Sequence, residues 1–217
     1  GRREARRMRY LIDTNHPGAE WLRRISRDIH PNCRRKFLEN FYGNGWLLAG
    51  RKREQFSEKY GFTPPWLLVV DVTMRCNLRC QGCWAASYKE NGRAELEYRE
   101  LVRVLKEARD RMGIHFFAIT GGEPFMRADT WELYRELDDC QFMIYSNATL
   151  IDNVAARRLR DLGNCMLMLS IEGSRESTAQ RRGGKSYDAV MNAMEMLRKE
   201  GVLFGFSATP NRHNWDE

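Results

Sequence analysis

The sequence lacks any apolar run that approaches the roughly 20 residues of a membrane-spanning helix. Its longest apolar stretches, Trp66–Val70 and Ile114–Ile119, have the length of strands. The chain opens with Gly-Arg-Arg-Glu-Ala-Arg-Arg and has no apolar segment behind it, so we expect no signal peptide. These absences favour a cytoplasmic protein with no membrane span.

Cysteines are few, because the 217 residues include only six, and three of these lie within eight residues of one another. A disulfide framework spreads its cysteines through a small, loop-rich chain, whereas clustered thiols in a reducing compartment more often bind metal. Histidines are scarcer still, and the four do not cluster in the sequence: His16, His30, His115 and His213. A lone histidine is usually a surface or core residue, so we assign none of them to a site.

Acidic residues are in deficit, which gives a formal net charge of +7. Much of the excess lies at the N-terminal end, where the residues up to and including Lys36 comprise eleven Arg or Lys and four Asp or Glu. We interpret this region as a solvated helix surface. A patch for nucleic acid or acidic lipid is the alternative interpretation.

The first part of the chain has the apolar spacing of helices. The residues that carry this spacing are Trp21, Leu22, Ile25, Phe37, Leu38, Phe41 and Tyr42. We expect Gly43, Gly45 and Gly50 to interrupt the helices, and Gly61 with the following Pro64-Pro65 to mark a boundary. We therefore divide the chain into a helical N-terminal extension at residues 1–62 and a core domain at residues 63–217.

Strands and helices alternate through the core domain, which predicts an α/β fold with a parallel sheet. The expected strands are Trp66–Val72, His115–Thr120, Gln141–Ser146, Met166–Ile171 and Val202–Ala208, and the expected helices are Leu96–Met112, Thr130–Leu137, Asp152–Leu162 and Tyr187–Lys199. Five such strands fit an open or partial barrel or a doubly wound sheet. Because the chain ends directly after the fifth strand, we expect the domain to be truncated there.

The most informative segment is Cys76-Asn-Leu-Arg-Cys80-Gln-Gly-Cys83, immediately after the first expected strand. Ligands of α/β folds bind at the carboxyl ends of the strands, and thiolates suit iron–sulfur clusters or zinc. Three thiolates leave a four-iron cluster one cysteine short. Cys140 and Cys165 precede strands and would lie at the opposite end of a parallel sheet, so the open iron is better explained as a binding position. A structural cluster or zinc knot is the alternative.

A second motif, Gly121-Gly-Glu-Pro124, directly follows the second expected strand. Gly121 and Gly122 allow the backbone to approach a ligand closely, Glu123 is an anionic acceptor, and Pro124 rigidifies the turn. Together with the CxxxCxxC spacing, this motif resembles the signature of the radical S-adenosylmethionine (SAM) superfamily. The resemblance covers roughly residues 66–210. It implies a partial (β/α) barrel with about five of six βα units present, in which the Gly-Gly-Glu-Pro turn contacts the amino group of SAM.

Weaker matches follow the next two strands. Ser146 and Asn147 begin a segment similar to the family's Thr-Asn-Gly-Thr, and Ser170 and Glu172 lie in one similar to its Ser-hydrophobic-Asp-Gly. The resemblance implies that these side chains bind SAM. The segment Arg182–Asp188 is similar to one common in peptide-modifying and cofactor-maturing members. Many members have an aromatic residue immediately before the third cysteine, whereas this chain has Gly82, so Trp84 would have to substitute.

The resemblance implies a 4Fe-4S cluster on Cys76, Cys80 and Cys83 whose open iron binds SAM. Reduction by a flavodoxin or ferredoxin-type donor would cleave SAM into methionine and a 5′-deoxyadenosyl radical, which abstracts hydrogen from a substrate. The substrate would be a peptide or a small metabolite. Two alternatives belong to other classes: a non-catalytic iron–sulfur or zinc protein, and a basic protein that binds nucleic acid or modifies RNA.

Overall fold

A computed structural model describes residues 9–10, 13, 17–85, 95–212 and 214–215. The core is one five-stranded sheet in which every neighbouring pair is parallel and the strands follow chain order. Its strands are β1 Leu67–Thr73, β2 Phe116–Gly121, β3 Gln141–Ser146, β4 Cys165–Ser170 and β5 Phe204–Ser207. The predicted α/β fold and its five parallel strands are therefore confirmed.

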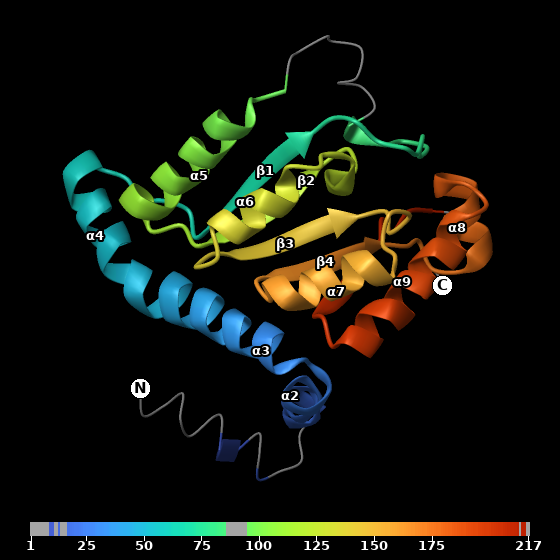
Figure 1. Cartoon of the computed structure of the whole chain (residues 1–217), viewed down its shortest axis with the longest axis horizontal. Coiled ribbons are helices and arrows are strands. Elements are labelled where there is room, and N and C mark those ends of the chain that lie inside the picture. Colours follow the sequence, from blue (N-terminus) through green and yellow to red (C-terminus); the bar gives the residue numbers. More distant parts are fainter. Residues whose placement is uncertain (1–8, 11–12, 14–16, 86–94, 213, 216–217) are drawn as a thin grey trace.

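The crossover helices all lie on one face of the sheet (Figure 1). They are α5 Tyr98–Met112, α6 Thr130–Glu136, α7 Asn153–Leu162 and α9 Ser186–Glu200. This arrangement follows from the sequential strand order, because right-handed crossovers that always step in one direction place every helix on the same side. A doubly wound sheet reverses direction and has helices on both faces. The molecule is therefore a partial barrel.

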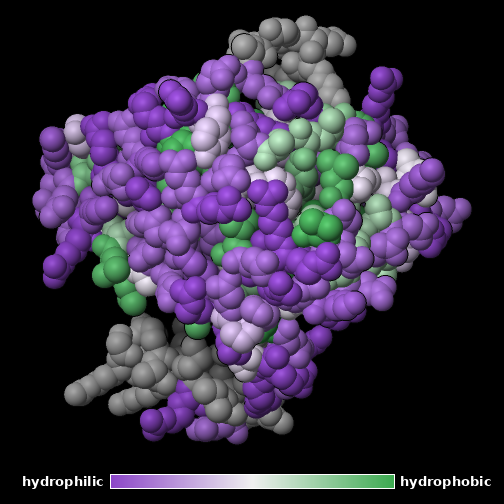
Figure 2. All heavy atoms as spheres, in the orientation of Figure 1, coloured by the Kyte–Doolittle hydropathy of each residue, from purple (hydrophilic) through white to green (hydrophobic). Residues whose placement is uncertain are grey.

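The main core lies between the sheet and these helices. Phe142 and Ile144 of β3 and Leu167 and Leu169 of β4 are all fully buried in it. The predicted inner face of α5 is confirmed, since its buried residues are Leu101, Val102, Leu105 and Ala108. The outer surface of the helix layer is mostly hydrophilic, with small separate apolar areas (Figure 2), as expected for amphipathic helices that face solvent.

The edge strands are less buried than the sequence predicts. Val69 of β1 is 60% exposed and Asp71 is also exposed, although the apolar run suggested a fully buried strand. These residues alternate with Leu68 and Val70, which pack against the main core. Side chains of a strand alternate between two faces, and the helices cover only one face of this sheet. The prediction of a buried first strand is therefore wrong for the residues on the other face.

The N-terminal extension contains α2 Pro17–Asp28 and then one continuous helical rod. The rod comprises α3 Pro31–Phe37, the π-helix η1 Leu38–Leu48 and α4 Ala49–Tyr60. The expectation that glycines interrupt it is wrong, because Gly43, Gly45 and Gly50 all lie within helical turns. The rod ends as predicted at Gly61, which has a φ of 78°. The side chains of Trp21, Leu22 and Ile25 and the N-terminal residues 1–8 lie outside the described residues.

The rod runs along the end of the sheet where the strands begin (Figure 1). Its polar side chains hydrogen-bond to backbone carbonyls at the ends of the crossover helices. Asn32 donates to Arg160 at 2.9 Å, Asn40 donates to Cys140 at 2.9 Å, and Arg53 donates to Gly113 at 3.2 Å. The extension therefore closes the bottom of the partial barrel and leaves the carboxyl ends of the strands open. A domain boundary at residue 62 stays a prediction.

Helix α8, Arg175–Arg182, which lies between β4 and α9, was not predicted. None of the helices in the described ranges combines the length and the apolar composition needed to cross a membrane.

Candidate functional site

Cys76, Cys80 and Cys83 lie on the loop that follows β1, at the carboxyl end of the sheet. All three are in the thiol form and have intermediate exposure. The backbone N–H of Cys83 donates to the Cys80 carbonyl at 3.2 Å, and Gly82 between them has a φ of 66°, which a side chain would disfavour. Gly82 therefore permits the tight turn that connects Cys80 to Cys83.

The three thiols are close enough to influence one another. Burial raises the pKa of the Cys80 thiol, as do Cys83 and Cys76, while Arg182 and Arg181 oppose the rise. Thiolates are ligands for iron–sulfur clusters, in which each thiolate binds a different iron, and also for zinc.

The Gly-Gly-Glu-Pro turn packs directly against the start of the cysteine loop. Gly122 N donates to the Thr73 carbonyl at 2.7 Å, and Glu123 N donates to the Arg75 carbonyl at 2.8 Å. A Cβ added to Gly122 would collide with the Arg75 carbonyl, and one added to Gly121 would collide with that of Thr73. The two glycines are therefore required by backbone packing at this position.

Glu123 is fully buried, and both oxygens of its carboxylate already accept hydrogen bonds. Ser146 Oγ donates to Oε1 at 2.9 Å and Asn147 N donates to Oε2 at 2.7 Å, while Phe125 N lies 3.3 Å from Oε1. Burial raises the pKa of Glu123, and these donors oppose the rise. Pro124 is buried and begins the short helix η3, Pro124–Met126. The interpretation of Glu123 as an acceptor for an ammonium group stays a prediction.

Asn147 connects this turn to the cysteine loop. Its Nδ2 donates to Asn77 Oδ1 at 2.9 Å and lies 3.8 Å from Cys76 Sγ. Its Oδ1 accepts from the hydroxyl of Thr149 at 2.6 Å. The structure therefore brings Cys76, Glu123 and Asn147, which follow three different strands, into one hydrogen-bonded group.

Ser170 and Glu172 lie at the end of β4, and only Glu172 is fully buried. Ser170 pairs in register with Ser207 of β5. Glu172 Oε1 accepts from Arg181 Nη1 and Arg182 Nε, each at 2.6 Å, and Oε2 accepts from Thr209 N at 3.0 Å. Burial raises the pKa of Glu172, but these three donors outweigh it and hold the pKa below its ordinary value.

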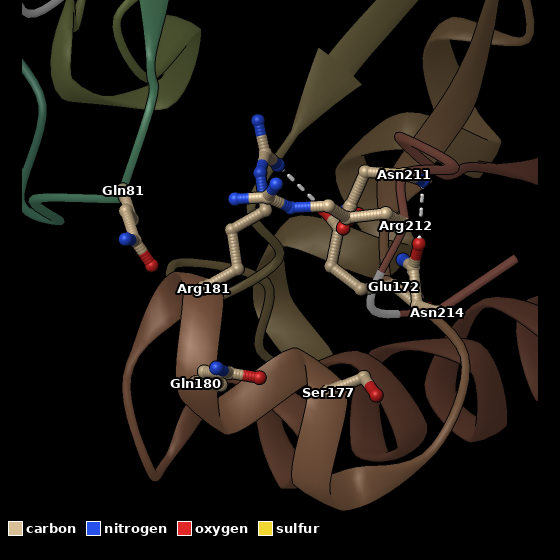
Figure 3. Close-up of a pocket in the computed structure, with 8 residues that line it drawn as sticks. All are labelled: Gln81, Glu172, Ser177, Gln180, Arg181, Asn211, Arg212 and Asn214. Carbon is tan, nitrogen blue, oxygen red and sulfur yellow. Dashed lines mark hydrogen bonds and ion pairs between the residues drawn. The ribbon is translucent and has the colours of Figure 1, made fainter.

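A polar pocket of about 310 Å³ lies between α8, the cysteine loop and the segment after β5 (Figure 3). Its lining residues are Gln81, Glu172, Ser177, Gln180, Arg181, Asn211, Arg212 and Asn214. The backbone N–H of Gln81, between Cys80 and Cys83, donates to the Arg181 carbonyl at 2.8 Å. The pocket therefore adjoins the thiols directly, and its hydrogen-bonding groups are suited to a polar ligand.

Two arginines of the site were missed in the sequence. Arg127 is 5% exposed, and its guanidinium donates to the Val72 and Leu96 carbonyls at 2.8 and 2.9 Å. Arg181 bridges α8 to Glu172. Neither arginine belongs to a motif. The only indication in the sequence was the presence of an arginine close to the end of a strand. Trp84, which was considered as a substitute aromatic residue, is 51% exposed beside the loop.

Comparison with known proteins gives one family and several relatives. A family model described as the radical SAM superfamily matches residues 70–217. The chain is 31% identical over 151 residues to an Fe-coproporphyrin III synthase of Methanosarcina barkeri, covering 68% of this chain and 38% of that protein. It is 30% identical over 168 residues to the mycofactocin maturase MftC of Mycolicibacterium smegmatis, covering 76% and 42%. The chain thus spans less than half the length of these relatives.

Solved structures show the same fold. The protein anSMEcpe with bound AdoMet superposes with a TM-score of 0.57 at 25% identity, covering 65% of this chain and 43% of that chain. Streptococcus suis SuiB bound to its precursor peptide SuiA gives a TM-score of 0.63 at 22% identity, covering 78% and 39%.

Proposed function

Since the chain belongs to the radical SAM superfamily, we propose that Cys76, Cys80 and Cys83 hold a 4Fe-4S cluster whose fourth iron binds SAM. The proposal rests on one observation: the loops that follow β1, β2 and β3 are hydrogen-bonded to one another beside the cysteine thiols. Asn147 contacts both Cys76 and Asn77, Glu123 binds Asn147, and Gly122 and Glu123 bind the backbone that leads into the cysteine loop.

The donor set of the loop fits this cofactor. Three thiols on one loop provide three of the four ligands that a 4Fe-4S cluster needs. A structural zinc site would need a fourth ligand as well. In the described chain the other three cysteines, Cys33, Cys140 and Cys165, are buried in the bottom half of the barrel, so none of them is placed to fill the fourth position.

The bound cluster would supply the electron that cleaves SAM to methionine and a 5′-deoxyadenosyl radical, which abstracts hydrogen from the substrate. The residues of this chain would bind and orient SAM. We assign backbone contacts with its methionine part to the Gly121–Pro124 turn, and the remaining contacts to Ser146, Asn147, Ser170 and Glu172. Because the carboxylates of Glu123 and Glu172 are engaged by protein donors, both act chiefly by fixing the loops that line the site.

We propose a peptide or a small metabolite as the substrate class. The named relatives support this choice, because they include an Fe-coproporphyrin III synthase and a PqqA peptide cyclase. We also propose a flavodoxin or ferredoxin as electron donor in a reducing cytoplasm. Exposed Arg75 and Arg79 flank Cys76 and Cys80 and would attract such acidic proteins.

The proposal is tested by anaerobic reconstitution with iron and sulfide. The expected result is about four irons per chain by the cluster stoichiometry, an electron paramagnetic resonance signal after dithionite reduction, a change in that signal when SAM is added, and formation of 5′-deoxyadenosine. Alanine at Cys76, Cys80 or Cys83 should abolish all four observations. Alanine at Cys33, which is buried at the far end of the sheet, is the matched control and should abolish none.

Two outcomes would contradict the proposal. A cluster that forms but gives neither a SAM-dependent change nor 5′-deoxyadenosine would identify a non-catalytic iron–sulfur protein. Stoichiometric zinc in place of iron after oxygen-free purification would identify a zinc site.

A further inference from the structure

A second group of metal-ligating atoms lies at the opposite end of the sheet from the cysteine loop. Donor atoms of His115, Asp139 and Cys140 all lie within 4.8 Å of one another. Cys140 Sγ is 4.0 Å from His115 Nδ1 and 3.7 Å from Asp139 Oδ1. Tetrahedral coordination with bonds of about 2.0–2.3 Å separates neighbouring ligand atoms by roughly 3.5 Å. His115 Nδ1 also lies 3.3 Å from the backbone carbonyl of Asp139, so the imidazole must exchange this contact for the ion when it binds.

We propose that His115, Asp139 and Cys140 form a metal site for one Zn²⁺ or a similar borderline divalent ion. Thiolate, imidazole and carboxylate are the ligands that zinc prefers, and water would complete four-coordination. Binding forms a zinc–sulfur bond and releases the thiol proton of Cys140 to solvent, with no change of oxidation state. The interpretation of His115 as a lone histidine was based on sequence distance alone, whereas the fold brings it to a cysteine and a carboxylate.

The helical rod holds this group in place from the other side. Asn40 Nδ2 donates to the Cys140 carbonyl at 2.9 Å, and Asn44 Nδ2 donates to that of Asp139 at 3.0 Å. A Cβ added at Gly45 would lie 3.8 Å from His115 Cβ, so the rod packs against the base of the His115 side chain. Partners that orient the ligands strengthen metal sites. All three rod residues belong to η1, and π-helical turns are frequent at functional sites.

The charges that face the group are compatible with a bound cation. Arg109 Nη1 donates to Asp139 Oδ1 at 2.9 Å, but a carboxylate has about four lone-pair positions and can bind both groups. Lys52 and Asp110 also interact electrostatically with the imidazole of His115, and they carry opposite charges.

The test uses the full chain with Cys76, Cys80 and Cys83 all replaced by alanine, so that no cluster ligand remains. Titration with Co²⁺ should give a thiolate-to-cobalt charge-transfer band that saturates at one equivalent and is reversed by Zn²⁺. Adding Cys140→Ser should abolish the band, and adding His115→Gln should weaken binding at least about tenfold, the lower range seen when metal-site residues are removed. Cys33→Ser, at another buried cysteine near the same end of the sheet, is the matched control and should leave the titration unchanged.

The proposal is overturned if the parent variant binds less than one equivalent, or if the band survives Cys140→Ser. Circular dichroism in EDTA checks that each variant is folded, and Zn²⁺ should raise the melting temperature of the parent more than that of the His115→Gln variant. An equal rise in both variants would also overturn the proposal. Because the cluster ligands are absent from every sample, failure here leaves the proposed SAM chemistry untouched, and failure of SAM cleavage leaves this site untouched.

Discussion

The buried carboxylate of Glu123 accepts a 2.7 Å hydrogen bond from the backbone N–H of Asn147, so the turn after β2 holds the turn after β3. The side-chain amide of Asn147 in turn contacts the sulfur of Cys76, the first cysteine of the loop after β1. The position of the thiols therefore depends on a carboxylate that is not exposed to the ligand site. Substitutions in this connection should affect stability and cluster loading together.

We predict that Glu123→Gln destabilises the fold. Both carboxylate oxygens accept hydrogen bonds, and the amide nitrogen of glutamine cannot accept one, so a buried donor loses its partner. Such a loss costs about 1–3 kcal/mol. Urea unfolding of the protein without its cluster measures the change, and the iron content after reconstitution should fall in parallel. Glu54→Gln, on the exposed side of α4, is the control, and equal effects of the two substitutions would refute the prediction.

We predict that Gly122→Ala displaces the turn from the cysteine loop, because the new Cβ would collide with the Arg75 carbonyl. Overpacking against a backbone atom costs about 1–3 kcal/mol. The free energy of unfolding and the iron content should both decrease. Gly184→Ala adds the same methyl group at a position with no atom within 4 Å of the new Cβ. A Gly122 variant as stable as the Gly184 variant would show that the backbone yields without cost.

The elements that carry the site were predictable because their signals are local. The cysteine spacing and the Gly-Gly-Glu-Pro turn each follow an apolar run of strand length, and parallel strands place both at the same edge of the sheet. The partners within the site were not predictable in the same way. Glu123 and Asn147 are 24 residues apart, and only the pairing of β2 with β3 brings them together.

Helix α8 and the continuous rod are two further features that the sequence pattern did not predict, for different reasons. The sequence of α8, Arg-Glu-Ser-Thr-Ala-Gln-Arg-Arg, has no apolar stripe, and only Thr178 is buried, so no helical period was visible. In the rod, glycines suggested breaks, but the bonds of Asn40 and Asn44 to the loop before β3 are tertiary contacts that override the weak helix propensity of glycine.

We predict that Asn147→Ala lowers the midpoint potential of the bound cluster. The side-chain amide lies 3.8 Å from Cys76 Sγ, and a hydrogen bond to a cluster ligand stabilises the reduced, more negative state. A net contribution of about 0.5–1.5 kcal/mol corresponds to a shift on the order of 20–60 mV for one electron. Potentiometric titration monitored by electron paramagnetic resonance measures it. Asn192→Ala, exposed on α9, should leave the potential unchanged, and an unchanged potential in the Asn147 variant would rule out the contact.

The last prediction concerns the pH dependence that Glu172 gives to the fold. Its side chain is 1% exposed, and the Thr209 N–H, Arg182 and Arg181 hold its pKa below the ordinary value of 4.5 in spite of burial. A carboxyl group whose folded pKa is lowered stabilises the fold at pH values above its unfolded pKa. That stabilisation is lost as the pH falls below about 4.5 and through the folded pKa.

Glu172→Gln removes the charge and leaves the two arginines without their buried partner, which should cost about 3 kcal/mol at neutral pH. Because glutamine does not titrate, the difference in unfolding free energy between wild type and Glu172→Gln should shrink as the pH falls from 7 through the acidic range. Urea unfolding at a series of pH values measures this difference. Glu176→Gln, exposed on α8, the helix that carries the two arginines, should give a small difference at every pH. If the difference in unfolding free energy between wild type and Glu172→Gln stays constant with pH, the carboxyl group keeps its ordinary pKa. The ion pairs between Glu172 and α8 would then contribute nothing to holding the polar pocket beside the thiols.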